Sequence, residues 1–386
     1  MKNNPLPTRT DSISSFIVMD VMEKAQILEA QGHDIIHMEI GEPDFPTPEP
    51  VKAAAVESLQ KGDTHYTHSL GKIELREEIS RYYWNKYQVN VSPDQIIVTS
   101  GTSPALLLIL SVLVESGQNV ILPDPCYACY PNFIKFLGGN PRFVPVYEED
   151  GFKYRPETVA EYIDPQTKAV LVNSPSNPCG TVFSSDNYRA LTDLSPFIIS
   201  DEIYNGLVYE GREHTVLQFT SDAFVINGFS KLYAMTGWRL GYLIAPRQYI
   251  RPMQKVQQNL FICAASFAQE GGIAALRECD SHVEEMRKTY DERRRFLLSR
   301  LHEMDIATKV DPTGAFYALA NIKAYSNDSY SFAFEIMENA GLAVTPGIDF
   351  GPNCEGYIRL SYASSIEAIK TGLERLENFL SNYEKR

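Results

Sequence analysis

The sequence has no excess of basic residues. Its 49 Asp and Glu outnumber its 35 Lys and Arg, so that the formal net charge is −14 at pH 7. Proteins that bind nucleic acids present basic faces, because lysine and arginine neutralise the phosphates that they contact. We therefore expect no nucleic-acid partner, and the acidic balance mainly favours solubility.

Long hydrophobic runs are missing as well. The longest, residues 105–114, is interrupted by Ser111 and is too short to cross a bilayer. Residues 1–11 are polar and contain no apolar core of the kind that a signal peptide needs. The sequence accordingly predicts no membrane partner and a cytoplasmic location.

Cysteine is scarce, with six residues in a chain of 386. This usage points to free thiols in a reducing compartment rather than to a disulfide framework. Cys126 and Cys129 form a lone C-x-x-C, and no second cysteine or histidine pair at similar spacing completes a zinc site. We interpret the two as small apolar residues around an aromatic one, and we predict no metal site.

The middle of the chain alternates between strand-like and helix-like patterns. Strands are expected at residues 95–99, 119–122, 142–145, 168–172, 197–200, 223–226 and 238–245. Helical patterns lie at residues 51–61 and 73–87 and, between several of the strands, at 104–115, 130–137, 156–163 and 185–194. This alternation predicts a mainly parallel α/β sheet that is covered on both faces, with its ligand beyond the carboxyl ends of the strands.

After Pro246 the pattern changes. Long helices are expected at residues 249–277 and 282–304, then strands at 315–320 and 356–362, with further helices at 330–340 and 366–383. For a chain of this length we predict two domains. The large α/β domain would span residues 46–280, and a smaller α+β domain would combine residues 1–45 with 281–386.

One lysine stands among apolar and aromatic residues. Lys231 lies on a turn after the strand at 223–226, and Arg239 follows eight residues later. Desolvation would lower the pKa of the Lys231 amine and free it, uncharged, to attack a carbonyl. Arg239 offers a fork for a phosphate or carboxylate. A lysine that forms a Schiff base near a phosphate clamp is what pyridoxal phosphate requires.

The segment from Ser230 to Gly241 reads S-K-x-Y-x-M-x-G-W-R-x-G and resembles the lysine segment of fold-type I aminotransferases of class I/II. Further motifs of that family stand in the expected order: G-E-P-D-F at 41–45, N-x-P-x-N-P-x-G at 173–180, D-E-x-Y at 201–204 and R-L-S-Y-A at 359–363. The resemblance implies a fold-type I, pyridoxal-phosphate-dependent transferase with a seven-stranded sheet in its large domain. It also implies transfer of an α-amino group from an amino acid to a 2-oxo acid, with 2-oxoglutarate as the expected acceptor.

An anion site is expected where residues 99–104 follow a strand and precede a helix. Gly101, Thr102 and Ser103 supply a glycine, two hydroxyls and exposed N–H groups at the helix N-terminus. Pro104 is expected as the first helical residue, with a Ser or Thr cap before it. With a lysine that needs a phosphate partner, we interpret this loop as the phosphate site.

Two more residues near the phosphate follow from the resemblance. Many family members have a serine three residues before the lysine, where this chain has Gly228, and Ser230 is the candidate that replaces it. Tyr66 corresponds to the tyrosine that reaches the cofactor phosphate of the neighbouring subunit. The resemblance therefore implies a homodimer with shared sites.

The pyridine ring has four expected partners. Asp201 comes directly after the strand at 197–200, and a carboxylate that faces the ring nitrogen keeps it protonated. Tyr204 is placed to donate to the ring's phenolate oxygen. The resemblance assigns Asn177 to that oxygen and to the substrate carboxylate, and it gives Tyr127 the aromatic position that stacks on the ring. Lys231, once displaced by the amino acid, would carry the proton from the substrate Cα as general base and acid.

Two residues are expected to bind the amino-acid substrate. The resemblance implies that Gly41 contacts it. Arg359 stands inside an otherwise apolar strand, which is costly without an anionic partner, and its planar guanidinium suits an α-carboxylate. No second arginine can be assigned to a side-chain carboxylate, so aspartate, alanine and aromatic donors all remain open.

Other functions share these motifs. Carbon–sulfur β-lyases and aminocyclopropane-carboxylate synthases have the same cofactor and release different products. Some transcription regulators contain an aminotransferase-like domain without catalysis, but they add a DNA-binding domain. The residues before Gly41 have no basic character that would indicate one.

Overall fold

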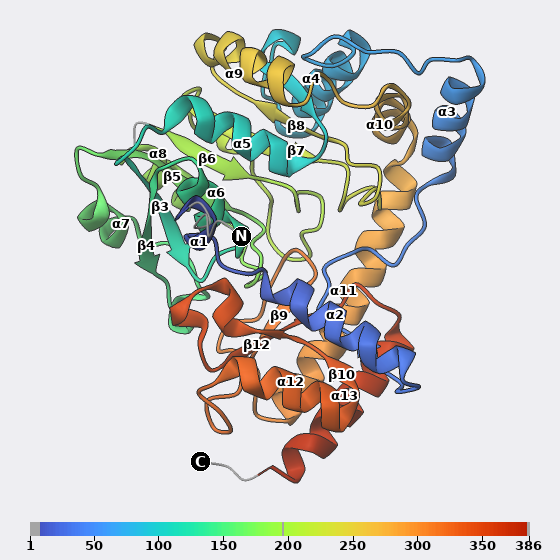
Figure 1. The fold of residues 1–386 in the computed structure, drawn as a ribbon, viewed down its shortest axis with the longest axis vertical. Coiled ribbons are helices and arrows are strands. Elements are labelled where there is room, and N and C mark those ends of the chain that lie inside the picture. The colour runs from blue at the N-terminus through green and yellow to red at the C-terminus, as the bar shows by residue number, and fades with distance from the viewer. Residues whose placement is uncertain (1–7, 195–196, 384–386) are drawn as a thin grey trace, which may run out of the picture.

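The computed structural model describes residues 8–194 and 197–383 (Figure 1). Its centre is a seven-stranded sheet with the order β2-β8-β7-β6-β5-β3-β4. The strands are β2 (Ile96–Thr99), β3 (Asn119–Asp124), β4 (Asn140–Pro145), β5 (Thr167–Asn173), β6 (Ile198–Asp201), β7 (Ala223–Gly228) and β8 (Gly241–Ile244). Only β8 runs antiparallel to its neighbours β2 and β7 within this sheet. The predicted fold class, a mainly parallel seven-stranded α/β sheet, is confirmed.

Hydrophobic residues fill both faces of this sheet. Along β5, Val170 and Val172 pack into one core cluster, whereas Ala169 and Leu171 pack into another. Because successive side chains of a strand point to opposite faces, this alternation places one core on each side. A strand that is buried on both faces has no polar side, which is why these strands read as continuous apolar runs.

Helices cover the sheet close to where they were predicted. They are α3 (Glu49–Gln60), α4 (Ile73–Tyr87), α5 (Thr102–Leu113), α6 (Cys129–Phe136), α7 (Pro156–Tyr162), α8 (Ser185–Thr192), α9 (Arg247–Leu260) and α10 (Ser266–Glu278). The single helix expected at 249–277 is wrong, because the chain turns between α9 and α10, where Ile262 has a φ of +66°. The strand expected from residue 238 starts later, because Arg239 has a φ of +51° and β8 begins at Gly241.

The lower half of Figure 1 combines both ends of the chain. Its elements are α2 (Ile17–Ala30), β1 (Ile36–His37), α11 (Asp280–Glu303), β9 (Tyr317–Asn321), α12 (Ser329–Ala340), β10 (Leu342–Ala343), β11 (Thr345–Pro346), β12 (Tyr357–Ser361) and α13 (Ile366–Ser381). The short helix α1 (Thr8–Asp11) lies apart from them, beside α6. β11, β12 and β9 form an antiparallel sheet, and β1 pairs in parallel with β10. The N-terminal segment therefore joins the C-terminal elements, while the limits of the two domains stay a prediction.

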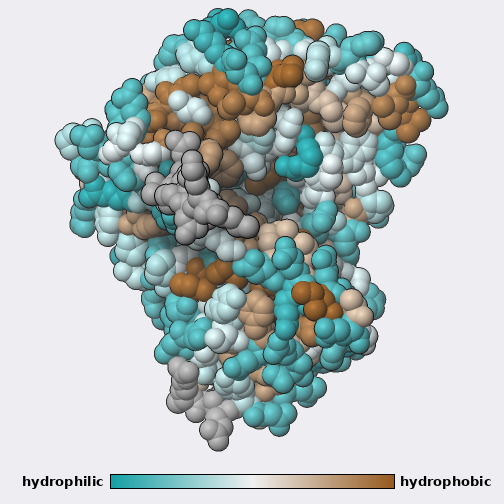
Figure 2. All heavy atoms as spheres, viewed as in Figure 1, coloured by the Kyte–Doolittle hydropathy of each residue, from teal (hydrophilic) through white to brown (hydrophobic). Residues whose placement is uncertain are grey.

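Figure 2 shows hydrophobic side chains gathered in a band over α5 and α9, above a hollow near the middle of this face. In the described part of the chain, no helix is both long and apolar enough to span a membrane. The six cysteines are free thiols. Within residues 8–194 and 197–383, no group of three or more His, Cys, Asp or Glu side chains could hold a metal ion.

Candidate active site

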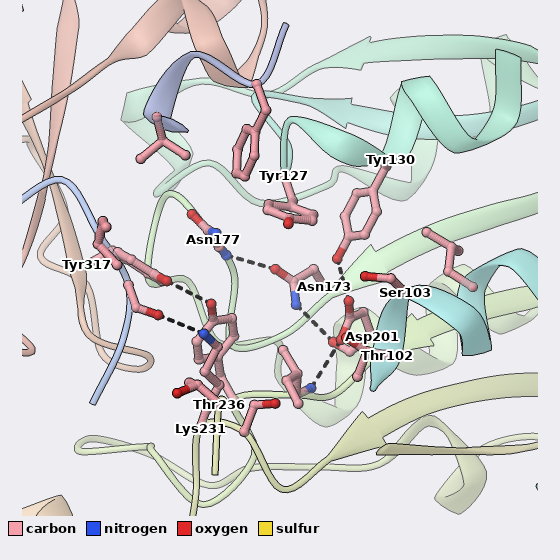
Figure 3. Close-up of a pocket in the computed structure, with 18 of the residues that line it drawn as sticks. Thr102, Ser103, Tyr127, Tyr130, Asn173, Asn177, Asp201, Lys231, Thr236 and Tyr317 are labelled. Carbon is pink, nitrogen blue, oxygen red and sulfur yellow. Dashed lines mark hydrogen bonds between the residues drawn. The ribbon is translucent and has the colours of Figure 1, made fainter. Parts of the chain in front are cut away.

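A cavity of about 280 Å³ lies beyond the carboxyl ends of the parallel strands, between them and the smaller antiparallel sheet (Figure 3). Most of the predicted site residues line it: Gly41, Thr102, Ser103, Tyr127, Asn177, Asp201, Tyr204, Ser230, Lys231, Arg239 and Arg359. Gly101 and Tyr66 do not. Parallel sheets place their ligands at this edge, so the location agrees with the one expected from the strand pattern.

Lys231 follows β7 on a turn and points its amine into the cavity. Its Nζ donates to the backbone carbonyl oxygen of Gly41 at 2.7 Å. Burial lowers the pKa of the Lys231 amine to about 8; the charge of Glu42 opposes this, and the charges of Arg359 and Arg239 add to it. The amine is therefore partly uncharged at neutral pH, and an uncharged amine is a nucleophile.

Asp201 is the last residue of β6, and its carboxylate is buried at the cavity. Its Oδ2 accepts from the hydroxyl of Tyr130 at 2.7 Å, and its Oδ1 accepts from the N–H of Ile203 at 3.2 Å. Burial raises the pKa of Asp201 to about 6, and these two hydrogen bonds oppose the rise. Asp201 is thus ionised at neutral pH. Tyr130 was not among the residues predicted from the sequence to form the site, because an aromatic residue in an amphipathic helix usually belongs to the hydrophobic core.

Arg359 is only 3 % exposed and is held by neutral groups. Its Nη1 donates to Oδ1 of Asn177 at 2.8 Å, and its Nη2 donates to Oγ1 of Thr345 at 3.1 Å and to the carbonyl oxygen of Glu39. The guanidinium lies 4.3 Å from the ring centroid of Tyr317. Since none of these partners is a carboxylate, the buried charge is free to bind an anion.

Asn173 joins two of the loops that carry site residues. Its Oδ1 accepts from the N–H of Asn177 at 2.7 Å, and its Nδ2 donates to the carbonyl oxygen of Asp201 at 2.9 Å. Both hydrogen bonds are visible in Figure 3. Asn173 opens the motif at 173–180, but no role could be assigned to it from the sequence.

Aromatic side chains form much of the remaining wall. The hydroxyls of Tyr204 and Tyr317 lie 2.8 Å apart, and both residues are buried. Tyr127 packs edge-on against Phe16, with ring centroids 5.8 Å apart, and edge-on against Tyr130. The N-terminal segment also contributes apolar residues to the wall, namely Phe16, Val18 and Met19. They were missed because no motif in the sequence marks them.

The expected phosphate site lies at the N-terminus of α5, but the predicted cap is wrong. The helix begins at Thr102, and its N-cap is Gly101, which has a φ of +99° and makes no side-chain hydrogen bond. A Cβ at Gly101 would lie 2.4 Å from Nη2 of Arg239, so glycine allows the loop and the guanidinium to come together. Thr102, Ser103 and Arg239 line this end of the cavity, where a helix N-terminus attracts anions.

Gly228 stands where many family members have a serine, and it packs closely against the neighbouring strand. A Cβ there would lie 3.0 Å from the Cα of Gly241 on the neighbouring strand, so a larger residue would need β7 and β8 to shift by a few tenths of an ångström. Ser230 lines the cavity. Tyr66 is 82 % exposed, and its contact with a second subunit stays a prediction.

Residues 33–376 match the family model of aminotransferases of class I and II. The chain belongs to this family. An aminotransferase of Methanocaldococcus jannaschii, (5-formylfuran-3-yl)methyl phosphate transaminase, is 44 % identical over 381 residues, which are 97 % of this chain and 100 % of the relative. Aspartate aminotransferase of Pyrococcus horikoshii is 37 % identical over 371 residues, 94 % of each chain. A crystal structure from Methanococcus jannaschii, described as similar in its active site to kynurenine aminotransferases, superposes with a TM-score of 0.92 at 43 % identity, over 97 % of this chain and 100 % of that one.

Aminotransferases of this family use pyridoxal phosphate, and the cavity has the groups that such a cofactor needs. Thr102, Ser103 and Arg239 line the cavity at the first turn of α5, where Gly101 lets the guanidinium come close and where a phosphate fits. The Lys231 amine and the Asp201 carboxylate face the same cavity. The donor set of this aminotransferase therefore fits the cofactor at its phosphate, its aldehyde and its ring nitrogen.

Proposed function

We propose that this aminotransferase moves the α-amino group of an amino acid to a 2-oxo acid, with 2-oxoglutarate as the acceptor, by using pyridoxal phosphate bound to Lys231. The observation that carries the proposal is the buried Lys231 amine, whose pKa is lowered to about 8, in one cavity with the Asp201 carboxylate and the Arg359 guanidinium. A nucleophilic amine, a carboxylate that keeps the ring nitrogen protonated and a cation that binds the substrate carboxylate are what an amino-group transfer requires.

The cofactor would be held by residues from several loops. Its phosphate would contact Gly101, Thr102, Ser103, Ser230 and Arg239; its ring nitrogen Asp201; its ring oxygen Tyr204 and Asn177; and its ring face Tyr127. When bound, pyridoxal phosphate accepts the electron pair that remains on the substrate Cα after proton loss. Asp201 supports this by holding a proton at the ring nitrogen.

The amino acid would bind against Arg359 and Gly41. Two parallel N–H···O hydrogen bonds from Arg359 would fix the α-carboxylate, with Asn177 beside it. Lys231 Nζ, which now donates to the carbonyl oxygen of Gly41, would take the proton from the substrate Cα and deliver it to the cofactor. The side chain of the donor would point toward the apolar wall that includes Phe16.

The working form would be a homodimer, in which Tyr66 of each chain reaches the cofactor phosphate of the other. In support, Tyr66 is highly exposed, and two large apolar side chains, Leu260 and Ile262, are exposed as well. Free cysteines support a cytoplasmic location. We keep the division into domains at residues 46–280 and at 1–45 with 281–386 as part of the proposal.

Lys231→Ala tests the assignment. The wild-type protein should show the visible absorbance of lysine-bound cofactor, lose it when an amino donor is added alone, and regain it with 2-oxoglutarate. The variant should show neither change nor turnover. A panel of aspartate, alanine and aromatic donors identifies the substrate class. Unchanged turnover by Lys231→Ala would refute the proposal, and release of ammonia and pyruvate from a β-substituted amino acid without any 2-oxo acid would identify a β-lyase instead.

A further inference from the structure

His37 and Glu39 form an ion pair behind Arg359, and neither lines the cavity. Glu39 is fully buried, and its Oε1 accepts from Nδ1 of His37 at 2.7 Å. The side chain of His37 is 38 % exposed, and its Nε2 lies 3.2 Å from Oε1 of Glu29 in α2. Glu39 lies at a bend two residues after His37, the last residue of β1, and the hydrogen bond joins the two side chains directly.

Glu39 contacts Arg359 through its backbone. The carbonyl oxygen of Glu39 accepts from Nη2 of Arg359 and, at 3.0 Å, from Oγ1 of Thr345. Nη2 also reaches Oγ1 of Thr345. Because a guanidinium is planar and rigid, the groups that hold Nη2 set the direction of its other N–H groups. The Glu39 peptide therefore orients the whole fork of Arg359.

The ion pair adds a side-chain contact to a segment whose backbone is held at Met38, where the N–H donates to the carbonyl oxygen of Ala343 at 3.0 Å and the carbonyl oxygen accepts from the N–H of Ser361 at 2.7 Å. A buried carboxylate is costly unless a cation pairs with it, and among the described residues Glu39 has its salt bridge with His37. Its other oxygen, Oε2, is buried and has no hydrogen-bond partner within the described part of the chain. The hydrogen bond that His37 donates to Glu39 raises the pKa of His37 to about 9, with Glu29 adding to the rise, so His37 carries its charge at neutral pH.

We propose that His37 and Glu39 are positioning residues for the substrate: the charged pair fixes the Glu39 peptide, and this peptide aims Arg359 at the α-carboxylate. The inference rests on the carboxylate-binding role proposed for Arg359. Neutralising His37 or Glu39 leaves the charge of Arg359 in the cavity, but the guanidinium is then no longer held in one orientation. Affinity for a carboxylate should then fall, whereas affinity for an uncharged ligand of the same shape should not.

Binding of 3-phenylpropionate and of its uncharged amide, 3-phenylpropionamide, tests the proposal by calorimetry on the cofactor-loaded protein. We expect Glu39→Gln and His37→Gln to bind the carboxylate about tenfold more weakly than the wild type, and the amide equally well. His37→Lys, which keeps a cation beside Glu39, should restore most of the affinity. Glu29→Gln makes the same change at the outer partner of His37, and its affinity for the carboxylate should stay within about twofold of that of the wild type.

Wild-type affinity for the carboxylate in both Glu39→Gln and His37→Gln would overturn the proposal. Equal losses for the carboxylate and the amide would overturn it as well, because they would indicate a general disturbance of the cavity. If Glu39→Gln does not fold, His37→Gln at its half-exposed site carries the test. The proposed function can fail separately. If the wild type transfers no amino group but the variants still lose affinity for the carboxylate alone, the role of the His37–Glu39 pair stands.

Discussion

The hydroxyl of Tyr130 donates to the carboxylate of Asp201 at 2.7 Å, and both side chains are buried. This hydrogen bond favours the ionised form of a carboxyl group whose pKa burial has already raised to about 6. It also connects α6 to the end of β6. Tyr130 is thus a neighbour on which the charge of Asp201 depends, although it was not among the predicted site residues.

Tyr130→Phe should raise the pKa of Asp201 further. More Asp201 would then be protonated at neutral pH, so the acidic limb of the profile of kcat/KM against pH should move upward. At pH 7 we expect a loss of about tenfold, because a hydrogen bond to a charged group contributes about 1.5–3 kcal/mol. The control is Tyr188→Phe, which removes a buried hydroxyl from a residue that does not line the cavity. An unshifted acidic limb in Tyr130→Phe would contradict the prediction.

Covalent uptake of pyridoxal phosphate by the cofactor-free protein should be pH-dependent. The pKa of Lys231 is lowered to about 8, so the amine loses its proton as pH rises from about 7 to 9, and the uncharged form is the one that reacts. The rate of uptake, followed by absorbance, should rise over this interval with a midpoint near 8. Lys231→Ala should show no uptake. A rate that rises only above pH 10 would indicate an amine that is not desolvated.

Arg359→Lys should weaken substrate binding even though the charge is retained. A lysine cannot offer two parallel N–H groups, and it would also lose the hydrogen bonds to Asn177 and Thr345. We expect KM for the amino donor to rise about 30-fold or more, with a smaller change in kcat, in steady-state assays. Arg277→Lys, at a half-exposed site paired with Glu78, is the matched control. Unchanged KM would assign the carboxylate to another residue.

Gly101→Ala should reduce the affinity for the cofactor. Its Cβ would meet Arg239 at 2.4 Å, and a φ of +99° is strained for alanine. Gly32→Ala is a stringent control, since Gly32 has a similar φ of +94° but nothing within 4 Å of its added Cβ. Both variants should lose about 1 kcal/mol of stability from the backbone. Only Gly101→Ala should need much more pyridoxal phosphate for half-saturation, measured by fluorescence titration; equal affinities would contradict the prediction.

The fold and much of the cavity could be predicted because their signals are local. Asp201 ends β6, and Lys231 and Asn177 follow closely after the ends of β7 and β5; a strand end is visible in the sequence as the end of an apolar run. Parallel strands bring such ends to one edge, so three separate motifs imply one site. The family resemblance added residues whose partners are distant in the sequence, such as Gly41 and Arg359.

What the sequence did not reveal depends on tertiary contacts. Tyr317 and Phe16 look like core residues, because only the folded chain turns their side chains toward the cavity. The N-cap at Gly101 depends on how closely Arg239 approaches, and this arginine comes from another loop. The break between α9 and α10 lies in an apolar stretch without Gly or Pro, so helical periodicity continued across it.

The pairing of β1 with β10 has a consequence for the order in which the parts of the site can form during synthesis. The carbonyl oxygen of Glu39 and the guanidinium of Arg359 are separated by 320 positions along the chain. A nascent chain that has emerged only as far as α11 already contains Lys231, Asp201 and the phosphate loop, but it has no partner for its own N-terminal strand. The residues proposed to hold the cofactor are thus synthesised before Arg359, and we expect the contact between Arg359 and Glu39 to form late, since such long-range contacts form slowly.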